Sequence, residues 1–323
     1  MTTRPSPPAL SVALLAEGAF GSIARTVSHI AAQSEAPQIE LLLLAARPDL
    51  LQVDADAVRG LHSVRVLATS LEGGTGGARA MAVREAAAPV VAFAEDHCFP
   101  ESGWAAALLA AHQGPWAAVG PVVSNANPTS SVSWADYLMG YGPWIAPGKS
   151  EERDHLPGHN SSYKREPLLP FGEELVPLFE AETALQWRLR EHGHRLYQEA
   201  GARTAHTNFE QWGTWLRVSY HAGRVFAATR ALAWSPAKRV AFAAASPLVP
   251  LVRLRRHLSQ AFGARWPLSR ILRVTPTLLI GLIVDGAGQC AGALAGAGRS
   301  RGILVDWEFQ RNVPRKGRNS VAA

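Results

Sequence analysis

Three side chains that could bind a metal ion stand next to one another in the sequence, at Glu95, Asp96 and His97. They follow an apolar run, residues 90–94, with the length and composition of a buried strand. In parallel sheets flanked by helices, ligands bind beyond the carboxyl ends of the strands, so a functional group is expected here. Carboxylate and imidazole together suit Mg²⁺ or Mn²⁺, which bind nucleotide phosphates with few protein ligands. Taken alone, such a triplet is more often a solvated loop.

Three later segments carry polar residues that could belong to the same site. Residues 158–165 form a polar turn that enters a short strand and contains Asn160, and His206 closes another short strand. Glu180 and Glu182 stand at the start of an expected helix. A carboxylate there could act as a general base, or could merely favour the positive end of the helix. His206 could equally be a core histidine.

The elements that must position these residues are alternating strands and helices. Before residue 230, short apolar runs alternate with stretches of helical spacing. This alternation predicts an α/β fold with βαβ units and a mostly parallel sheet that is buried on both faces. We expect strands at residues 10–16, 40–45, 63–68, 90–94 and 117–123, and helices at residues 21–33, 77–88 and 102–113.

In their order and spacing these segments resemble the family 2 glycosyltransferases of the GT-A fold, from about Ser11 to Arg224. In that family the fourth strand ends in a D-x-D-like motif that holds a divalent ion on the diphosphate of a sugar nucleotide. Glu95, Asp96 and His97 occupy that place, and the family's later metal-binding histidine matches His206. The resemblance therefore implies a GT-A fold, Mn²⁺ or Mg²⁺ as cofactor, and a nucleotide-sugar donor.

The resemblance also implies the catalytic residues. The family's E-D pair opens a helix that reads L-x-x-R-L-x-x-x-G, and residues 185–193 show this frame with Glu182 at the position of the catalytic acid. Glu182 is thus the implied base, with Glu180 as second choice. The family's G-x-N-x-x-x-[RK] turn is matched around Asn160, and Arg79 matches the arginine of "A-R-N". We expect Arg79 and Asn160, with Glu95 and Asp96, to bind the donor; alternatively, Arg79 is a solvated helix residue.

Some family positions carry alanine in this chain. Ala45 and Ala46 stand where the family has acids after the second strand, and Ala80 and Ala181 replace a polar and an acidic residue. These positions support an alternative function, a catalytically inactive GT-A-like scaffold in a membrane polysaccharide assembly complex. The Q-x-x-R-W motif of processive synthases is absent, so a single-transfer enzyme is the favoured interpretation.

Positive charge is concentrated towards the C-terminal end of the sequence. The net charge is +6, acids lie mostly before Glu210, and cations dominate from Arg217 onward. This asymmetry suggests a negatively charged partner. We do not expect nucleic acid, because no binding motif is present and the aromatic residues are not interleaved with these charges.

Two apolar runs in the same region indicate contact with a membrane. Residues 240–252 are shorter than the ~20 residues that a span requires, and two prolines interrupt them. Residues 274–284 lead into Asp285, whose cost of about 2.5–3.5 kcal/mol at the centre of a bilayer disfavours a simple span. Basic residues flank both runs, as suits an anionic lipid surface. The alternative is a buried helical hairpin with a solvated basic rim.

Glycines at 288, 292 and 296 recur every fourth residue and predict a helix face that allows close packing. We divide the chain into a flexible leader (1–9), a GT-A domain (10–230), a helical membrane-associating region (231–300) and a basic tail (301–323).

Taken together, the resemblance implies an inverting, metal-assisted, non-processive glycosyltransferase. It would act on a glycan or lipid-linked acceptor at the cytoplasmic face of the cell membrane. Cell-envelope or exopolysaccharide synthesis is the expected setting.

Overall fold

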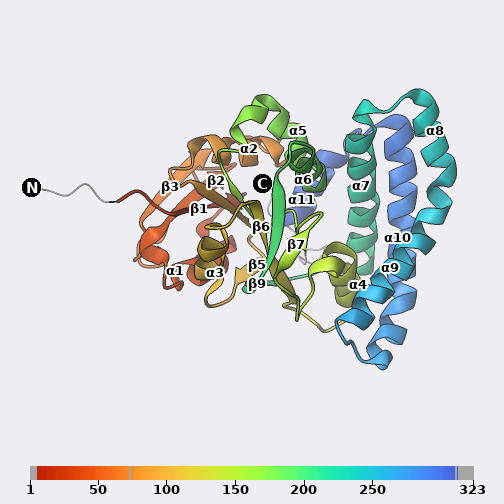
Figure 1. Cartoon of the computed structure of the whole chain (residues 1–323), viewed down its shortest axis with the longest axis horizontal. Coiled ribbons are helices and arrows are strands. Elements are labelled where there is room, and N and C mark those ends of the chain that lie inside the picture. Colours follow the sequence, from red (N-terminus) through yellow and green to blue (C-terminus); the bar gives the residue numbers. More distant parts are fainter. Residues whose placement is uncertain (1–5, 73, 310, 312–323) are drawn as a thin grey trace, which may run out of the picture. The chain divides into compact units, whose positions relative to one another are not determined.

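The computed structural model of the protein describes residues 6–72, 74–309 and 311, so the outer parts of the expected leader and basic tail lie outside the described residues. The chain divides into two compact units, whose ribbons are drawn in Figure 1. Unit 1 comprises Met1–Ser124 and Trp144–His206, and unit 2 comprises Asn125–Pro143 and Thr207–Ala323. The functional domain boundaries expected at residues 230 and 300 remain predictions.

Unit 1 is built around a sheet that has nine strands among the described residues. The strands are β1 (Leu10–Ala16), β2 (Ile39–Ala45), β3 (Ser63–Ala68), β4 (Val90–Ala94), β5 (Cys98–Pro100), β6 (Trp116–Asn125), β7 (Glu151–Arg153), β8 (Ser162–Lys164) and β9 (Arg195–His206). Their order across the sheet is β3-β2-β1-β4-β8-β6-β9-β5, and β7 pairs with β9.

The first half of the sheet is parallel, as the alternation of elements predicted. β1 pairs in parallel with β2 and β4, and β2 pairs in parallel with β3. All residues of β1, β2 and β4 are buried, which explains why these strands read as continuous apolar runs rather than as alternating ones. Four parallel strands therefore end at one edge of the sheet, with β4 next to the second half.

The second half is antiparallel, so the sheet is mixed. β8 runs antiparallel to both β4 and β6, and β9 runs antiparallel to both β5 and β7. Our expectation of a mostly parallel sheet therefore describes the first four strands. Among the short strands, β8 lies beside β4, whereas β5 and β7 pair with β9.

Helices cover both faces of the sheet in unit 1 (Figure 1). They are α1 (Ala24–Ala31), α2 (Gly76–Glu85), α3 (Trp104–Ala111), α5 (Leu175–Phe179) and α6 (Glu182–Glu191). α1 and α3 share one hydrophobic core with alternate residues of β1, β2 and β4, and α2 contacts the same three strands. The three helices expected from the sequence are all present, each shorter by a few residues at one or both ends.

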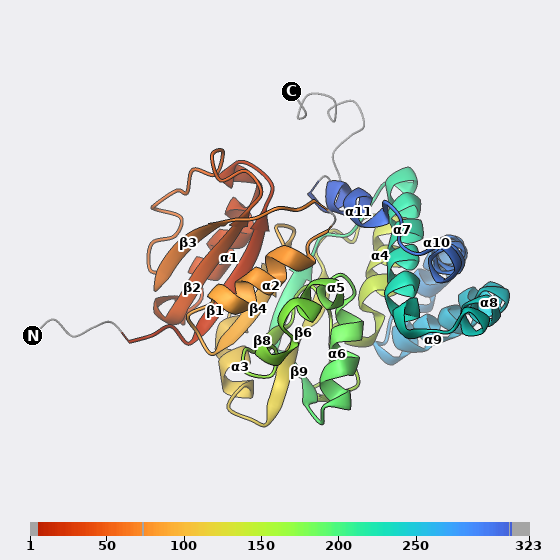
Figure 2. The same ribbon diagram turned by 90° about the horizontal axis from the view of Figure 1, so that it is seen from above.

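Unit 2 is helical, apart from the end of β6. Its helices are α4 (Ser131–Tyr141), α7 (Trp212–Arg230), α8 (Pro236–Ala245), α9 (Val249–Gly263), α10 (Leu268–Ala295) and α11 (Ser300–Phe309). Figure 2 shows α10 beside α7, with α8 and α9 next to it, and each of these three helices contacts α10. A short 3₁₀ turn, Ser246–Leu248, separates α8 from α9 where the prolines predicted an interruption.

The glycine face of α10 packs against α7. A Cβ atom at Gly288 would overlap the carbonyl oxygen of Tyr220, and one at Gly292 would overlap that of Arg224. Gly296 lies just beyond the helix with a φ of 70° and ends it. The predicted close approach of small residues is confirmed at two of the three positions, and its partner is another helix of unit 2.

α10 is long and apolar enough to cross a membrane, and no second helix among the described residues meets the same criteria. Half of its most apolar window (50%) is buried inside the protein, and core helices of soluble proteins can have the same length and hydropathy. Asp285 is buried near its middle, where it pairs with Arg253 of α9 and accepts a hydrogen bond from Gln289 at 2.7 Å. Length and composition alone therefore do not make α10 a span.

Candidate active site

A turn at the end of β4 holds the first two residues of the site. The backbone N–H of Cys98 donates to the carbonyl of Glu95 (3.2 Å) and closes the turn. Thr26 of α1 donates from Oγ1 towards the carbonyls of Glu95 (3.1 Å) and Asp96 (3.0 Å). Thr26 thus anchors the turn to α1 through the carbonyl groups of the turn, so this contact does not depend on the side chains of Glu95 and Asp96.

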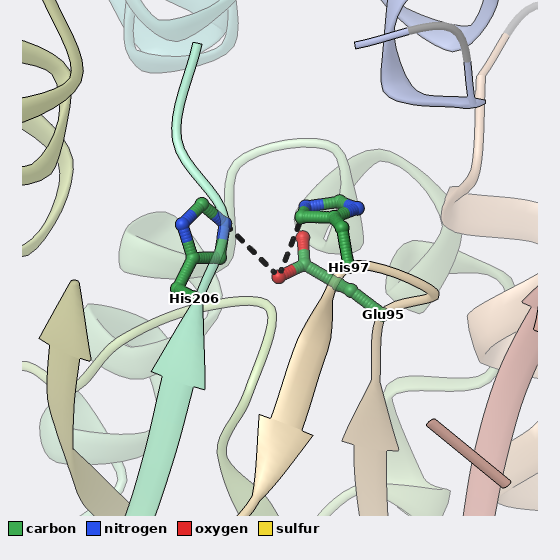
Figure 3. A group of neighbouring side chains, drawn as sticks. All are labelled: Glu95, His97 and His206. Carbon is green, nitrogen blue, oxygen red and sulfur yellow. Dashed lines mark ion pairs between the residues drawn. The ribbon is translucent and has the colours of Figure 1, made fainter. Parts of the chain in front are cut away.

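His206 reaches this turn through the antiparallel pairing of β5 with β9. In the observed register Cys98 lies opposite His206, and Phe99 lies opposite Ala205. The last residue of β9 therefore stands beside His97, although the two histidines are far apart in the sequence. Figure 3 shows Glu95, His97 and His206 gathered at these strand ends.

Glu95, His97 and His206 form a group with the composition of a metal site. All three are buried, and their potential ligand atoms lie within 4.8 Å of one another. Oε2 of Glu95 is 3.7 Å from Nε2 of His97 and 3.7 Å from Nε2 of His206. One carboxylate and two imidazoles fit a divalent metal ion. The structure thus brings together three of the four predicted metal ligands.

Asp96, the fourth predicted ligand, is not part of this group. Its Oδ1 lies 2.6 Å from Nδ1 of His97, on the ring nitrogen opposite the one that faces Glu95. A carboxylate at this nitrogen fixes the orientation and tautomer of the imidazole. The structure therefore places Asp96 behind a candidate ligand.

Asn160 lies inside the site rather than on its surface. It is buried in the turn before β8, and its Nδ2 donates to Oε2 of Glu95 at 2.7 Å. This hydrogen bond sets the position of the same oxygen that faces both imidazoles. The turn around Asn160 is thus part of the support for the metal group.

Arg79 and Glu182 form a buried ion pair. Arg79 comes from α2 and Glu182 is the first residue of α6, so the pair joins two helices. The alternative that Arg79 is a solvated helix residue is wrong, because its side chain is only 4% exposed. Breaking such a pair leaves a buried charge without its partner, which typically costs about 3–5 kcal/mol.

His159 connects this ion pair to the metal group, and sequence analysis did not assign it to the site. Its Nδ1 is 3.1 Å from Oε1 of Glu182 and 3.7 Å from Oε1 of Glu95. It also contacts the guanidinium of Arg79, and its side chain is 45% exposed. The one available signal is its place between Gly158 and Asn160 in the polar turn.

Glu180, the second candidate base, lies at the N-terminus of α2. Its Oε1 accepts a hydrogen bond from the backbone N–H of Gly76, the first residue of that helix. A carboxylate at this end of a helix interacts favourably with its dipole. The structure thus gives Glu180 a clear capping contact and leaves Glu182 as the acid next to His159.

Tyr163 packs beneath this network. It is fully buried on β8, and its hydroxyl accepts a hydrogen bond from Gln186 of α6 at 3.0 Å. Burial is the main cause that raises the pKa of Tyr163, the hydrogen bond from Gln186 lowers it, and the charge of Glu182 raises it further. The phenol therefore stays neutral at physiological pH.

Residues 14–169 match the model of the family described as "Glycosyl transferase family 2". Two similar solved structures are a crystal structure of GalNAc-T7 with UDP, GalNAc and Mn²⁺, and a structure of the mannosyltransferase PcManGT from Pyrobaculum calidifontis in complex with GDP-Man and Mn²⁺. The first is 14% identical, with a TM-score of 0.45 over 64% of this chain and 44% of that one. The second is 16% identical, with a TM-score of 0.46 over 99% of this chain and 84% of that one. This chain thus spans less than half the length of GalNAc-T7, and no curated protein matches it significantly.

Proposed function

We propose, from the family 2 glycosyltransferase domain that residues 14–169 carry, that this chain moves a sugar from a nucleotide-sugar donor to an acceptor hydroxyl group. The observation that carries this proposal is the group of Glu95, His97 and His206, which His159 connects to Glu182. Both halves of the required chemistry, leaving-group stabilisation and proton removal, thus have candidate residues in one network of unit 1.

Glu95, His97 and His206 would hold a divalent ion against the donor diphosphate. Such an ion neutralises the negative charge that grows on the diphosphate as the bond to the sugar breaks. Mn²⁺ and Mg²⁺ are both candidates, and the two imidazoles favour Mn²⁺, because Mg²⁺ prefers oxygen ligands. Asp96 would keep the ring of His97 in the orientation that presents Nε2 to the ion.

Glu182 would accept the proton of the acceptor hydroxyl group. A positioned carboxylate base typically accelerates such a step by about 10²–10⁴-fold. Arg79 and His159 contact this carboxylate and would hold it in place. Direct displacement by a hydroxyl group on the face opposite the diphosphate inverts the anomeric centre, so we propose an inverting, single-transfer reaction.

The proposed setting is the cytoplasmic face of the cell membrane, in cell-envelope or exopolysaccharide synthesis. The acceptor would be a glycan or a lipid-linked sugar, and the cations after Arg217 would face anionic lipid.

An inactive scaffold is the second candidate, and the end of β2 favours it. Ala45 is buried at the carboxyl end of that strand, so no carboxylate is available there to meet a nucleotide.

Calorimetry of the full chain with Mn²⁺ and a panel of UDP, GDP, dTDP and CDP sugars tests the proposal. Saturable binding of one donor that depends on Mn²⁺ is the expected result. His206→Ala should remove the dependence on Mn²⁺, because it deletes one of three ligands. No binding across the panel would support the scaffold instead.

Catalysis is tested with Glu182→Gln once a donor is known. This variant should lower the transfer rate by about 10²–10⁴-fold and leave donor affinity unchanged. Glu191→Gln, an exposed glutamate at the other end of α6, is the matched control and should transfer normally. If Glu182→Gln lost donor affinity together with transfer, Glu182 would be a structural residue.

A further inference from the structure

One side of α10 is both apolar and exposed. Leu272 is 65% exposed, Ile283 is 53% exposed and Leu294 is 52% exposed. At 100° per residue these positions fall within one narrow sector of the helix, together with other exposed residues. We call this sector the α10 stripe, and its members are Leu268, Leu272, Pro276, Ile280, Ile283, Ala287 and Leu294.

The neighbouring helices expose apolar side chains as well. α8 has no buried residue, and Val240 is 59% exposed. On α9, Leu251 and Val252 are more than 60% exposed, and Phe262 lies on the same side of that helix. Isolated exposed apolar residues are normal, but large groups of them indicate a surface that is covered in function.

The charge of this region identifies what covers it. Residues 231–296 contain eight Lys and Arg residues and a single acid, Asp285. That acid is buried in its pair with Arg253, so none of these cations faces an exposed carboxylate of this segment. Arg255 is exposed on the same side of α9 as Leu251, and Arg256 is exposed on the same side as Val252. Exposed apolar groups beside unopposed cations are complementary to an anionic lipid surface.

The helices cannot be placed favourably across the bilayer. The α10 stripe runs for about 33 Å from Leu272 to Leu294, close to the thickness of a hydrocarbon core, so a span is the alternative to exclude. Arg253 of α9 pairs with Asp285, near the middle of α10. If α10 crossed the membrane, Arg255 and Arg256 would therefore lie at the depth of the hydrocarbon, where Arg is strongly disfavoured.

We infer that α8, α9 and α10 lie flat on an anionic leaflet. The α10 stripe and the exposed residues of α8 and α9 then lie in the membrane–water interface, and both ends of α10 lie on the same side of the membrane. The inference specifies the membrane association of the proposed function and rests on it. It does not depend on the sugar chemistry, because every residue that carries it belongs to unit 2.

Sedimentation with vesicles tests the lipid contact in the full chain. The protein should pellet with vesicles of phosphatidylcholine and phosphatidylglycerol and stay in solution with pure phosphatidylcholine. Arg255→Gln with Arg273→Gln should weaken binding by about 25-fold, because each cation near an anionic surface contributes about 1 kcal/mol, or about fivefold. Leu251→Gln with Leu272→Gln should reduce binding by at least as much.

Exposed residues of unit 1 supply matched controls. Arg59→Gln with Arg84→Gln removes the same charge, and Leu50→Gln with Leu169→Gln removes comparable exposed apolar groups. Both pairs should leave vesicle binding unchanged. Equal losses in the controls and in the unit 2 variants would overturn the inference. The inference would also be overturned if the parent chain did not bind vesicles and formed a dimer in light scattering that the unit 2 variants convert to a monomer.

Labelling of introduced cysteines distinguishes an α10 that lies flat on the membrane from an α10 that crosses it. In a background of Cys290→Ala, which keeps the buried Cys98, Ser269→Cys and Arg299→Cys each place one exposed thiol near one end of α10. A membrane-impermeant maleimide added outside the vesicles should label both variants to the same extent. Labelling of only one end would show that α10 spans and would overturn the inference. Donor calorimetry on the same variants should match the parent chain, so a failure here is distinguishable from a failure of the proposed enzyme.

Discussion

His97 and Asp96 are neighbours in the sequence but serve the site differently. His97 joins Glu95 and His206, whereas Asp96 contacts the far side of the His97 ring. The sequence predicted all four as metal ligands, because residue type and place after β4 do not reveal which way each side chain of a turn points. The turn that Cys98 closes points the side chains of Glu95 and His97 into the group and leaves Asp96 on the far side of the His97 ring.

His159 marks the limit of sequence reasoning at this site. Its role rests on distances to Glu182 and Glu95, two residues that come from different elements. A lone histidine in a polar turn has no periodicity and no spacing that would link it to either acid. By contrast, Glu182 and His206 could be predicted because each closes or opens an element whose frame is visible in the sequence.

A buried histidine outside the site should make unfolding depend on pH. Burial and, to a lesser extent, Lys164 lower the pKa of His112 to about 3, and its Nε2 is 2.8 Å from Oγ of Ser162. The unfolded chain protonates this imidazole below about pH 6.5, but the folded protein does so only near pH 3. Between these values the unfolded state binds more protons, so acidification from pH 7 to pH 4 should lower the free energy of unfolding.

The contribution of His112 approaches about 1.4 kcal/mol for each pH unit within that window. Urea unfolding of His112→Gln should therefore show a shallower loss of stability on acidification than the parent chain. His192→Gln, at an exposed histidine, should keep the parent's profile. Identical profiles for the parent and His112→Gln would contradict the assignment.

At the scale of elements, the long apolar segments were predictable and the short strands were not. β1 and β3 have the bounds expected from the sequence, because their apolar runs are clear. β5, β7 and β8 have three residues each, too few for any periodicity, and their pairing depends on partners far away in the chain. The antiparallel half of the sheet, which brings in His206, therefore follows from tertiary structure.

α10 illustrates how packing extends a helix beyond its sequence signal. The apolar run at 274–284 is only the centre of a helix of 28 residues, and Pro276 lies within it. Proline removes a backbone hydrogen bond and normally costs about 3 kcal/mol inside a helix. The contacts of α10 with α7, α8 and α9 offset this cost and hold both halves of the helix together.

The contact between α7 and α10 should be sensitive to a single methyl group. Gly292→Ala would place Cβ against the carbonyl oxygen of Arg224, a backbone atom that cannot move independently of α7. Overpacking of this kind typically costs about 1–3 kcal/mol, so thermal unfolding should occur at a lower temperature. Gly213→Ala near the start of α7 meets no atom within 4 Å and should stabilise the protein by about 0.5–1 kcal/mol. Equal melting temperatures for the parent and Gly292→Ala would show that the helices are not in close contact.

At the scale of the whole molecule, the candidate active site and the segment rich in cations belong to different units. The residues of the candidate active site all belong to unit 1, whereas the C-terminal segment rich in cations belongs to unit 2. The sequence predicted a C-terminal region rich in cations, and its domain boundary at residue 230 stays a prediction. It could not predict that residues 125–143 join unit 2, because that segment precedes several strands of unit 1 in the chain.

Membrane binding of the whole protein should weaken with salt but not vanish. Raising NaCl from about 0.01 M to about 1 M shortens the Debye length from about 30 Å to about 3 Å and screens the cations of unit 2. Vesicle sedimentation should therefore fall severalfold, and the remainder should be lost in the Leu251→Gln, Leu272→Gln variant. Binding that is independent of salt would mean that the cations take no part in it.

The backbone ladder between β5 and β9 gives the site a property that its side chains do not. Because the register of β5 with β9 places Cys98 opposite His206, and the turn at Glu95 is anchored by Thr26, the backbone sets the three candidate ligand positions before any side chain is chosen there. Single codon changes at 95, 97 or 206 can thus exchange imidazole for carboxylate while the scaffold stays intact. If the proposed metal site is correct, such an architecture would let its preference among cations change by small evolutionary steps, without a change of the fold around it.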